Sequence, residues 1–276
     1  MAVQETPDPE LKKVLNEIPG GGPMVSFDRW WLLLVGVLAL IMLLIIVSPD
    51  PYLRIVMFVR DGIVVTIVTT IISFIFILIV GLMVALMRLS ANRFVVTVAT
   101  VYVEVVRGIP LLVQLFFWYF AFPSIIQEIG TRFNIEIFKN YLANPIAMAI
   151  LGLTFCYAAY ISEVFRAGIQ SIGKGQMEAA RSLGMNYSQA MRFVVLPQAL
   201  RVVLPPLGND FISLLKDSSL VSVVTVADMT RRGREFMAAN FIPVETWTMI
   251  ALLYLVMTLL AARVITWIEK KTRLEK

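Results

Sequence analysis

Residues 62–87 read GIVVTIVTTIISFIFILIVGLMVALM, a run of 26 residues without one charged side chain. A helix rises about 1.5 Å per residue and the hydrocarbon core of a bilayer is about 30 Å thick, so about 20 apolar residues are enough to cross it. The run is rich in β-branched residues, but an open sheet edge cannot lie in lipid. The stretch therefore predicts a membrane-spanning helix.

The same pattern recurs along the chain. Four further apolar runs occupy residues Trp30–Val47, Ala147–Phe165, Pro205–Val226 and Thr246–Trp267. Phe94–Phe122 is also long enough to span, although Glu104, Arg107 and Pro110 interrupt it. We expect one helix there that is kinked at the proline, with Glu104 and Arg107 placed for a local ion pair. The sequence thus predicts an all-α polytopic membrane protein with six spans.

Composition supports lipid as the main solvent of the chain. Hydrophobic residues make up 59% and charged residues 16% of the 276 positions, against roughly 45–50% and about 25% in soluble domains. The mean hydropathy is +0.82. The net charge of +5 is what basic cytoplasmic loops require, and no aromatic–basic patch suggests nucleic acid. With no histidine and one cysteine, the chain lacks the usual zinc ligands and a disulfide framework, so we expect no metal site.

The distribution of Lys and Arg predicts the orientation of the spans. With the N-terminus in the cytoplasm, fourteen basic residues fall in inner segments and seven in outer ones. The outer seven are Arg54, Arg60, Arg132, Lys139, Arg231, Arg232 and Arg234. This bias favours both termini on the cytoplasmic side, although the third outer loop is unusually basic.

The segment from Gly168 to Pro206, between the fourth and fifth spans, has the composition of helices. We expect a helix over Gln176–Leu183 that ends at Gly184. A second helix would be capped by Ser188 and stopped by Pro197. Such a pair could enter a groove of a partner protein, or it could lie as an amphipathic pair on the lipid surface.

This segment contains Glu178, Ala179, Ala180, Gly184, Val194, Leu196 and Pro197. The set resembles the EAA motif of ABC importer permeases, which usually has isoleucine where Val194 stands. Further stretches resemble the polar amino acid permeases: RGIPLLVQ at 107–114, YISEVFRAGI at 160–169, PPLGN at 205–209 and LKDSSLVS at 215–222. The similarity covers roughly residues 61–273.

The resemblance implies a type I ABC importer permease with a core of five transmembrane helices and one extra N-terminal transmembrane helix. Residues 1–28 would form a cytoplasmic tail, 29–60 the extra helix and an outer loop, 61–273 the permease domain and 274–276 a C-terminal tail. The coupling helices would lie at about 176–197, where the EAA residues would contact ATPase subunits. Gly184 would permit the bend between them.

The implied partners are ABC ATPase subunits, a solute-binding protein and a second permease subunit, identical or different, in the bilayer of the bacterial inner membrane. The chain itself would have no catalytic residue and no cofactor, because ATP and Mg²⁺ would bind to the ATPase. GIQSIGK at 168–174 has the spacing of a phosphate-binding loop, but Gly175 stands where that motif needs Ser or Thr.

Polar residues within the spans are candidates for the path of a polar amino acid. They are Arg107, Gln114, Tyr160, Glu163, Asn209, Asp210, Lys216, Asp217 and Ser218. A zwitterion needs a cation for its carboxylate, for which Arg107 is the candidate, and an acceptor for its ammonium, for which Glu163 or Asp210 is the candidate.

Two other classes of function remain as alternatives. A channel or secondary transporter would need its own gate or ion-coupling site, and no internal repeat favours one. A hydrolase built from Lys216, Asp217 and Ser218 is disfavoured, because adjacent residues on a helix point in different directions.

Overall fold

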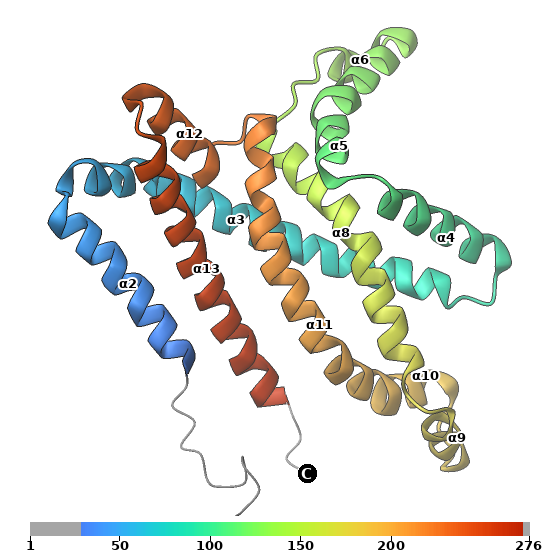
Figure 1. Ribbon diagram of the computed structural model, residues 1–276. Coiled ribbons are helices and arrows are strands. Elements are labelled where there is room, and N and C mark those ends of the chain that lie inside the picture. The colour runs from blue at the N-terminus through green and yellow to red at the C-terminus, as the bar shows by residue number, and fades with distance from the viewer. Residues whose placement is uncertain (1–28, 273–276) are drawn as a thin grey trace, which may run out of the picture.

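The computed structural model describes residues 29–272, which fold into helices and contain no strand (Figure 1). The predicted tails, residues 1–28 and 274–276, lie outside the described residues. The first helices are α2 (Arg29–Val47), α3 (Pro49–Arg88), α4 (Arg93–Gly108), α5 (Leu111–Phe116), the π-helix η1 (Phe117–Ala121), α6 (Phe122–Phe133), α7 (Glu136–Lys139) and α8 (Pro145–Gln170). They are followed by α9 (Lys174–Ser182), α10 (Tyr187–Ala190), the π-helix η2 (Met191–Val195), α11 (Leu196–Asp217), the 3₁₀-helix η3 (Ser218–Val224), α12 (Met229–Asn240) and α13 (Pro243–Thr272).

Among residues 29–272, six helical segments are long and apolar enough to cross a membrane, which confirms the predicted number of spans. They are Trp30–Val47, Pro49–Arg88, Leu111–Phe133, Pro145–Gln170, Tyr187–Val224 and Pro243–Thr272. The start of α2, the end of α13 and the α9–α10 pair all lie at one end of the bundle, which we call the α9 end (Figure 1). Helices α6, α7 and α12 lie at the opposite end, the α12 end.

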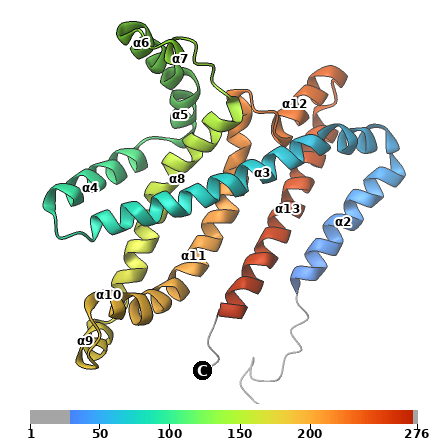
Figure 2. The same ribbon diagram turned by 180° about the vertical axis from the view of Figure 1, so that it is seen from behind.

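Helix α8 is the centre of the bundle. In its apolar window 61% of the residues are buried, against 11–28% in the other five spans. Small residues on α8 permit this packing: a Cβ on Gly152 would lie 3.0 Å from Leu115, and one on Gly168 would clash with Val203. Helix α3 runs diagonally across α8, α11 and α13, as Figure 2 shows, and therefore braces the bundle.

Helix α3 begins earlier than the sequence indicates. Residues 49–60, which we expected in an outer loop, form its first turns after a kink at Asp50. Ile55 and Val59 are fully buried there in a second core with Met229 and Phe236 of α12. These contacts with a segment 170 or more positions away explain why local sequence did not reveal the helix.

The third crossing is broken, so the prediction of one kinked helix over Phe94–Phe122 was wrong. Helix α4 ends at Gly108, Ile109 and Pro110 are extended, and a new helical segment runs from Leu111 to Phe133. The residue before a proline is kept out of the α region, and proline has no N–H to continue the ladder. The break therefore falls at Ile109–Pro110.

The α9–α10 pair has the predicted bend but different helix ends. Gly184 adopts φ +86°, a left-handed conformation that suits glycine. Asn186, rather than Ser188, caps α10 through a capping box with Gln189. Pro197 does not stop the helix, because the π-turn η2 precedes it and the chain continues into α11. The wider backbone of the π-helix η2 makes room for a proline, which has no N–H to donate to the preceding turn.

The extra N-terminal helix α2 packs on α13 and α3. The guanidinium of Arg263 on α13 lies 5.3 Å from the ring of Trp30 and 5.5 Å from that of Trp31. Ile41 of α2 joins the second core, while most other α2 side chains are exposed. Helix α2 is thus a peripheral addition to the remaining five spans.

Two glycines allow a matched test of this packing. A Cβ on Gly62 would lie 2.8 Å from the backbone of Met229, whereas one on Gly36 of α2 would meet nothing within 4 Å. We expect Gly62→Ala to destabilise the folded protein by about 1–3 kcal/mol through overpacking. Gly36→Ala should cause no loss. Thermal unfolding in detergent, followed by tryptophan fluorescence, measures both, and equal stabilities would contradict the close approach of α3 and α12.

Candidate functional site

A cavity of about 510 Å³ lies where the α4–α5 break meets α8 and α11. Its polar lining consists of Arg107, Tyr157, Tyr160, Asp210, Ser213 and Asp217. A second cavity of about 490 Å³ lies between α3, α11 and α13, but its lining is apolar apart from Thr70 and Glu269. Only the first has the convergent polar groups that a polar solute requires.

The break is held by Gln114. Its buried side-chain amide donates hydrogen bonds of 2.9 Å to the carbonyl oxygens of Val106 and Ile109, and it lies 3.4 Å from the sulfur of Cys156. One carbonyl belongs to the last turn of α4 and the other to the extended residue that follows it, and both lack a helical partner four residues on. Gln114, predicted on the substrate path, therefore lies behind the cavity wall and supports its backbone.

The cavity brings four predicted residues together: Arg107, Tyr160, Asp210 and Asp217. The guanidinium of Arg107 lies over the ring of Tyr160, 5.2 Å from its centroid. Asp217 accepts a hydrogen bond of 2.6 Å from the hydroxyl of Tyr157. We did not single out Tyr157, although it stands three positions before Tyr160 and hence on the same helix face.

Glu163 lies beside the cavity lining and pairs with three arginines. It accepts a hydrogen bond from Arg88 and one of 2.7 Å from Arg166, and an Arg107 nitrogen lies 3.9 Å away. The local pair of Glu104 with Arg107 that we expected is replaced by this contact within the described residues. Glu163 therefore joins the ends of α3 and α4 to α8.

Besides Gln114 and Glu163, three predicted residues lie apart from the cavity lining. Asn209 and Lys216 are exposed on other faces of α11. Ser218 is buried and donates to the backbone carbonyl of Leu215. Their positions follow from the 100° rotation per residue that spreads neighbouring side chains around a helix.

The EAA residues lie at the α9 end. Glu178, Ala179 and Gly184 are exposed, while Ala180 is buried. Val194, Leu196 and Pro197 are half-buried.

Three large apolar side chains, Leu183, Tyr187 and Phe193, are 82%, 62% and 63% exposed beside the EAA residues. We did not single out Tyr187 and Phe193 from the sequence. An apolar group at the tip of a polar helix pair is typical of a protein-docking surface.

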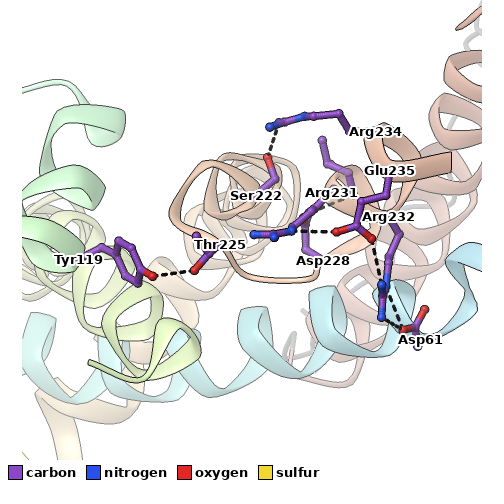
Figure 3. Close-up of polar contacts among 10 residues, drawn as sticks. Asp61, Tyr119, Ser222, Thr225, Asp228, Arg231, Arg232, Arg234 and Glu235 are labelled. Atoms are coloured by element: carbon purple, nitrogen blue, oxygen red, sulfur yellow. Dashed lines mark hydrogen bonds and ion pairs between the residues drawn. The ribbon is translucent and has the colours of Figure 1, made fainter. Parts of the chain in front are cut away.

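The α12 end carries a network of paired charges (Figure 3). Arg232 donates to Asp61 of α3 at 2.5 Å and to Glu235 at 2.9 Å, and Arg231 donates to Glu235 at 3.0 Å. Asp228 caps α12 by accepting from the backbone N–H groups of Arg231 and Thr230. Burial raises the pKa of the Asp228 carboxyl, and these hydrogen bonds oppose that rise. Much of the basic charge of this end is thus neutralised within the chain.

Two further contacts join η1 to the residue after η3, and η3 to α12 (Figure 3). The hydroxyls of Tyr119 in η1 and Thr225 after η3 are 2.7 Å apart. Arg234 of α12 donates to Ser222 of η3 at 3.1 Å. Thr225 has φ +62°, which is uncommon for a β-branched residue. These contacts hold the α5–α6 arm, η3 and α12 together beyond the cavity.

The chain matches a known family and several known proteins. Residues 77–274 match the family of binding-protein-dependent transport system inner membrane components. A probable glutamine ABC transporter permease of Bacillus subtilis is 38% identical over 78% of this chain and 93% of its own length. An arginine transport system permease of Corynebacterium glutamicum is 39% identical over 70% of this chain and 61% of its own length. A crystal structure of an amino acid ABC transporter with histidines matches with a TM-score of 0.68 and 35% identity over 79% of this chain and 96% of that chain.

The Glu163 cluster generates a stability prediction. Glu163→Gln removes the charge that neutralises Arg88 and Arg166, leaving partly buried cations without a counter-ion. We expect a loss of about 3 kcal/mol, whereas Glu136→Gln, at the exposed pair with Lys139, should cost less than about 1 kcal/mol. Thermal unfolding of the two variants in detergent compares them, and losses of equal size would contradict a structural role for the cluster.

Proposed function

We propose a mechanism from the premise that this chain belongs to the family of binding-protein-dependent transport system inner membrane components. It is the pore-forming permease subunit of an ATP-driven importer for polar amino acids, and its fold is that of the type I importers. The chain is not an enzyme, since ATP hydrolysis belongs to partner subunits. The resemblance seen in the sequence is thereby confirmed.

The orientation we propose places the α9 end in the cytoplasm and the α12 end outside. The excess of Lys and Arg in the inner segments supports it. The basic third outer loop runs against this bias, and there Arg231 and Arg232 pair with Asp61 and Glu235. The ATPase subunits would then contact α9 and α10, and the solute-binding protein would approach α6, α7 and α12. A second permease subunit, identical or different, would complete the pore, and ATP and Mg²⁺ would bind to the ATPase.

The substrate would bind in the cavity at the α4–α5 break. Broken membrane helices recur at transporter binding sites, since their ends offer polar groups at the depth of the bilayer. Arg107 would take the carboxylate of the amino acid by a charge-assisted hydrogen bond, and Asp210 or Asp217 would take the ammonium group. Glu163 is already paired with arginines, which favours the aspartates for this role. The polar cavity at the break is the observation that carries this assignment.

Coupling would proceed through α9 and α10. These helices connect α8 to α11, and both of those helices line the cavity. Closure of the ATPase dimer would move the pair as a rigid body and tilt the two cavity walls with it. The exposed Glu178 and the apolar side chains Leu183, Tyr187 and Phe193 offer the contacts for such a docked partner.

Uptake into proteoliposomes tests the proposed function. The vesicles hold this permease, its ATPase subunits and its binding protein, and a panel of labelled amino acids is offered with and without ATP. We expect concentrative uptake of amino acids with ATP only. Equilibration of the amino acids across the membrane at the same rate with and without ATP would instead support the alternative of a channel or facilitator.

Coupling variants use the same assay. Glu178→Lys and Gly184→Asp should insert normally but reduce uptake at least about tenfold, because each disturbs the docking of α9 and α10. Glu245→Lys, the same charge reversal in the first turn of α13, serves as the control and should retain uptake. Normal uptake by Glu178→Lys at normal abundance would remove the coupling assignment.

A further inference from the structure

The cavity presents more negative than positive charge to a ligand. Its lining contains one guanidinium, that of Arg107, and two carboxylates, those of Asp210 and Asp217. Glu163, Arg88 and Arg166 lie outside the lining, and their two guanidinium groups exceed the one carboxylate by a single positive charge. The surplus of negative charge therefore belongs to the groups that line the cavity itself. The C-terminal end of α4, at Gly108, borders the same cavity and adds partial negative charge.

The two carboxylates differ in their surroundings. Asp217 accepts the hydrogen bond from Tyr157, whereas Asp210 accepts no hydrogen bond and forms no ion pair within residues 29–272. Asp210 is half-buried in a span of the membrane, where an uncompensated charge is costly. Asp210 therefore has no cationic partner in the described part of the chain, and a positively charged ligand could supply one.

A neutral amino acid cannot supply enough positive charge. Its carboxylate pairs with Arg107 and its ammonium group with one aspartate, which leaves the other carboxylate without a cation. The hydroxyl of Tyr157 donates a hydrogen bond to Asp217 but carries no charge. A substrate with a second cation balances the cavity, because its net charge of +1 matches the surplus carboxylate.

We propose that the transported amino acid carries a cationic side chain, a guanidinium or an ammonium group, and that Asp210 is the residue that selects it. This inference rests on the proposed function and names the substrate class of the same cavity. Arg107 binds the α-carboxylate, Asp217 binds the α-ammonium group and Asp210 pairs with the side-chain cation. The rings of Tyr157 and Tyr160 offer further attraction for a cation.

The test is uptake of labelled arginine, lysine, glutamine and glutamate by the assembled importer in proteoliposomes. Wild-type protein should accumulate arginine or lysine in preference to glutamine and glutamate. Asp210→Asn should lower arginine uptake roughly tenfold to hundredfold, as expected for a lost hydrogen bond to a charged group. It should lower glutamine uptake less. Asp210→Glu keeps the charge and should keep the preference, and Asp50→Asn, at an exposed carboxylate outside the cavity lining, should leave uptake unchanged.

A binding measurement separates this selectivity from that of the binding protein. The detergent-solubilised permease–ATPase complex, without binding protein, should gain more thermal stability from arginine than from glutamine, and Asp210→Asn should abolish the difference.

Two results would overturn the inference and leave the proposed function intact. One is ATP-dependent uptake of glutamine or glutamate without arginine or lysine. The other is an unchanged ratio of arginine to glutamine in Asp210→Asn. If no amino acid accumulates with ATP, the proposed function itself fails. If Asp210→Asn does not assemble, the wild-type panel and Asp210→Glu decide the question.

Discussion

Within the hydrocarbon core of a bilayer no water is available to bond a free backbone N–H or carbonyl, so the protein must supply every partner itself. Helices meet this demand without help, and residues 29–272 consequently consist of helices joined by short turns. The backbone at Ile109–Pro110 is not helical, so its carbonyl groups need hydrogen-bond donors from elsewhere in the protein. The amide of Gln114 bonds the carbonyls of Val106 and Ile109. A polar cavity can open beside irregular backbone only because that backbone is satisfied from behind.

The same break connects the polar cavity to the rest of the bundle. It places Arg107 at the end of α4, between Tyr160 in the cavity wall and Glu163 in the arginine cluster. Helix α8 carries both of these partners and leads directly into α9. On α8 and α11, the residues that would hold a substrate are therefore joined through α9 and α10 to those that would meet an ATPase. Arg107 of α4 joins this group through its contacts with Tyr160 and Glu163.

Much of this architecture could be predicted from local sequence. Apolar runs gave the number of spans, and Gly184 gave the bend in the α9–α10 pair, because hydropathy and glycine conformation are properties of short segments. Features that depend on contacts between residues distant in the sequence could not be predicted. Residues 49–60 are helical because Ile55 and Val59 pack on α12, and Arg107 pairs with Glu163 of another helix. The π-turn before Pro197 and the cap at Asn186 depend on backbone geometry that composition does not fix. For the cavity, the sequence named Arg107, Tyr160, Asp210 and Asp217 but missed Tyr157 and could not separate Gln114 from the lining.

The chain contains a single cysteine, and Cys156 lies in the lining of the cavity against the amide of Gln114. Its side chain is only 3% exposed, so a maleimide would reach the thiol only when the surrounding helices move apart. In a complex whose other subunits contain no cysteine, the rate of labelling would therefore report how often this wall of the cavity opens in the resting, nucleotide-bound and substrate-bound states.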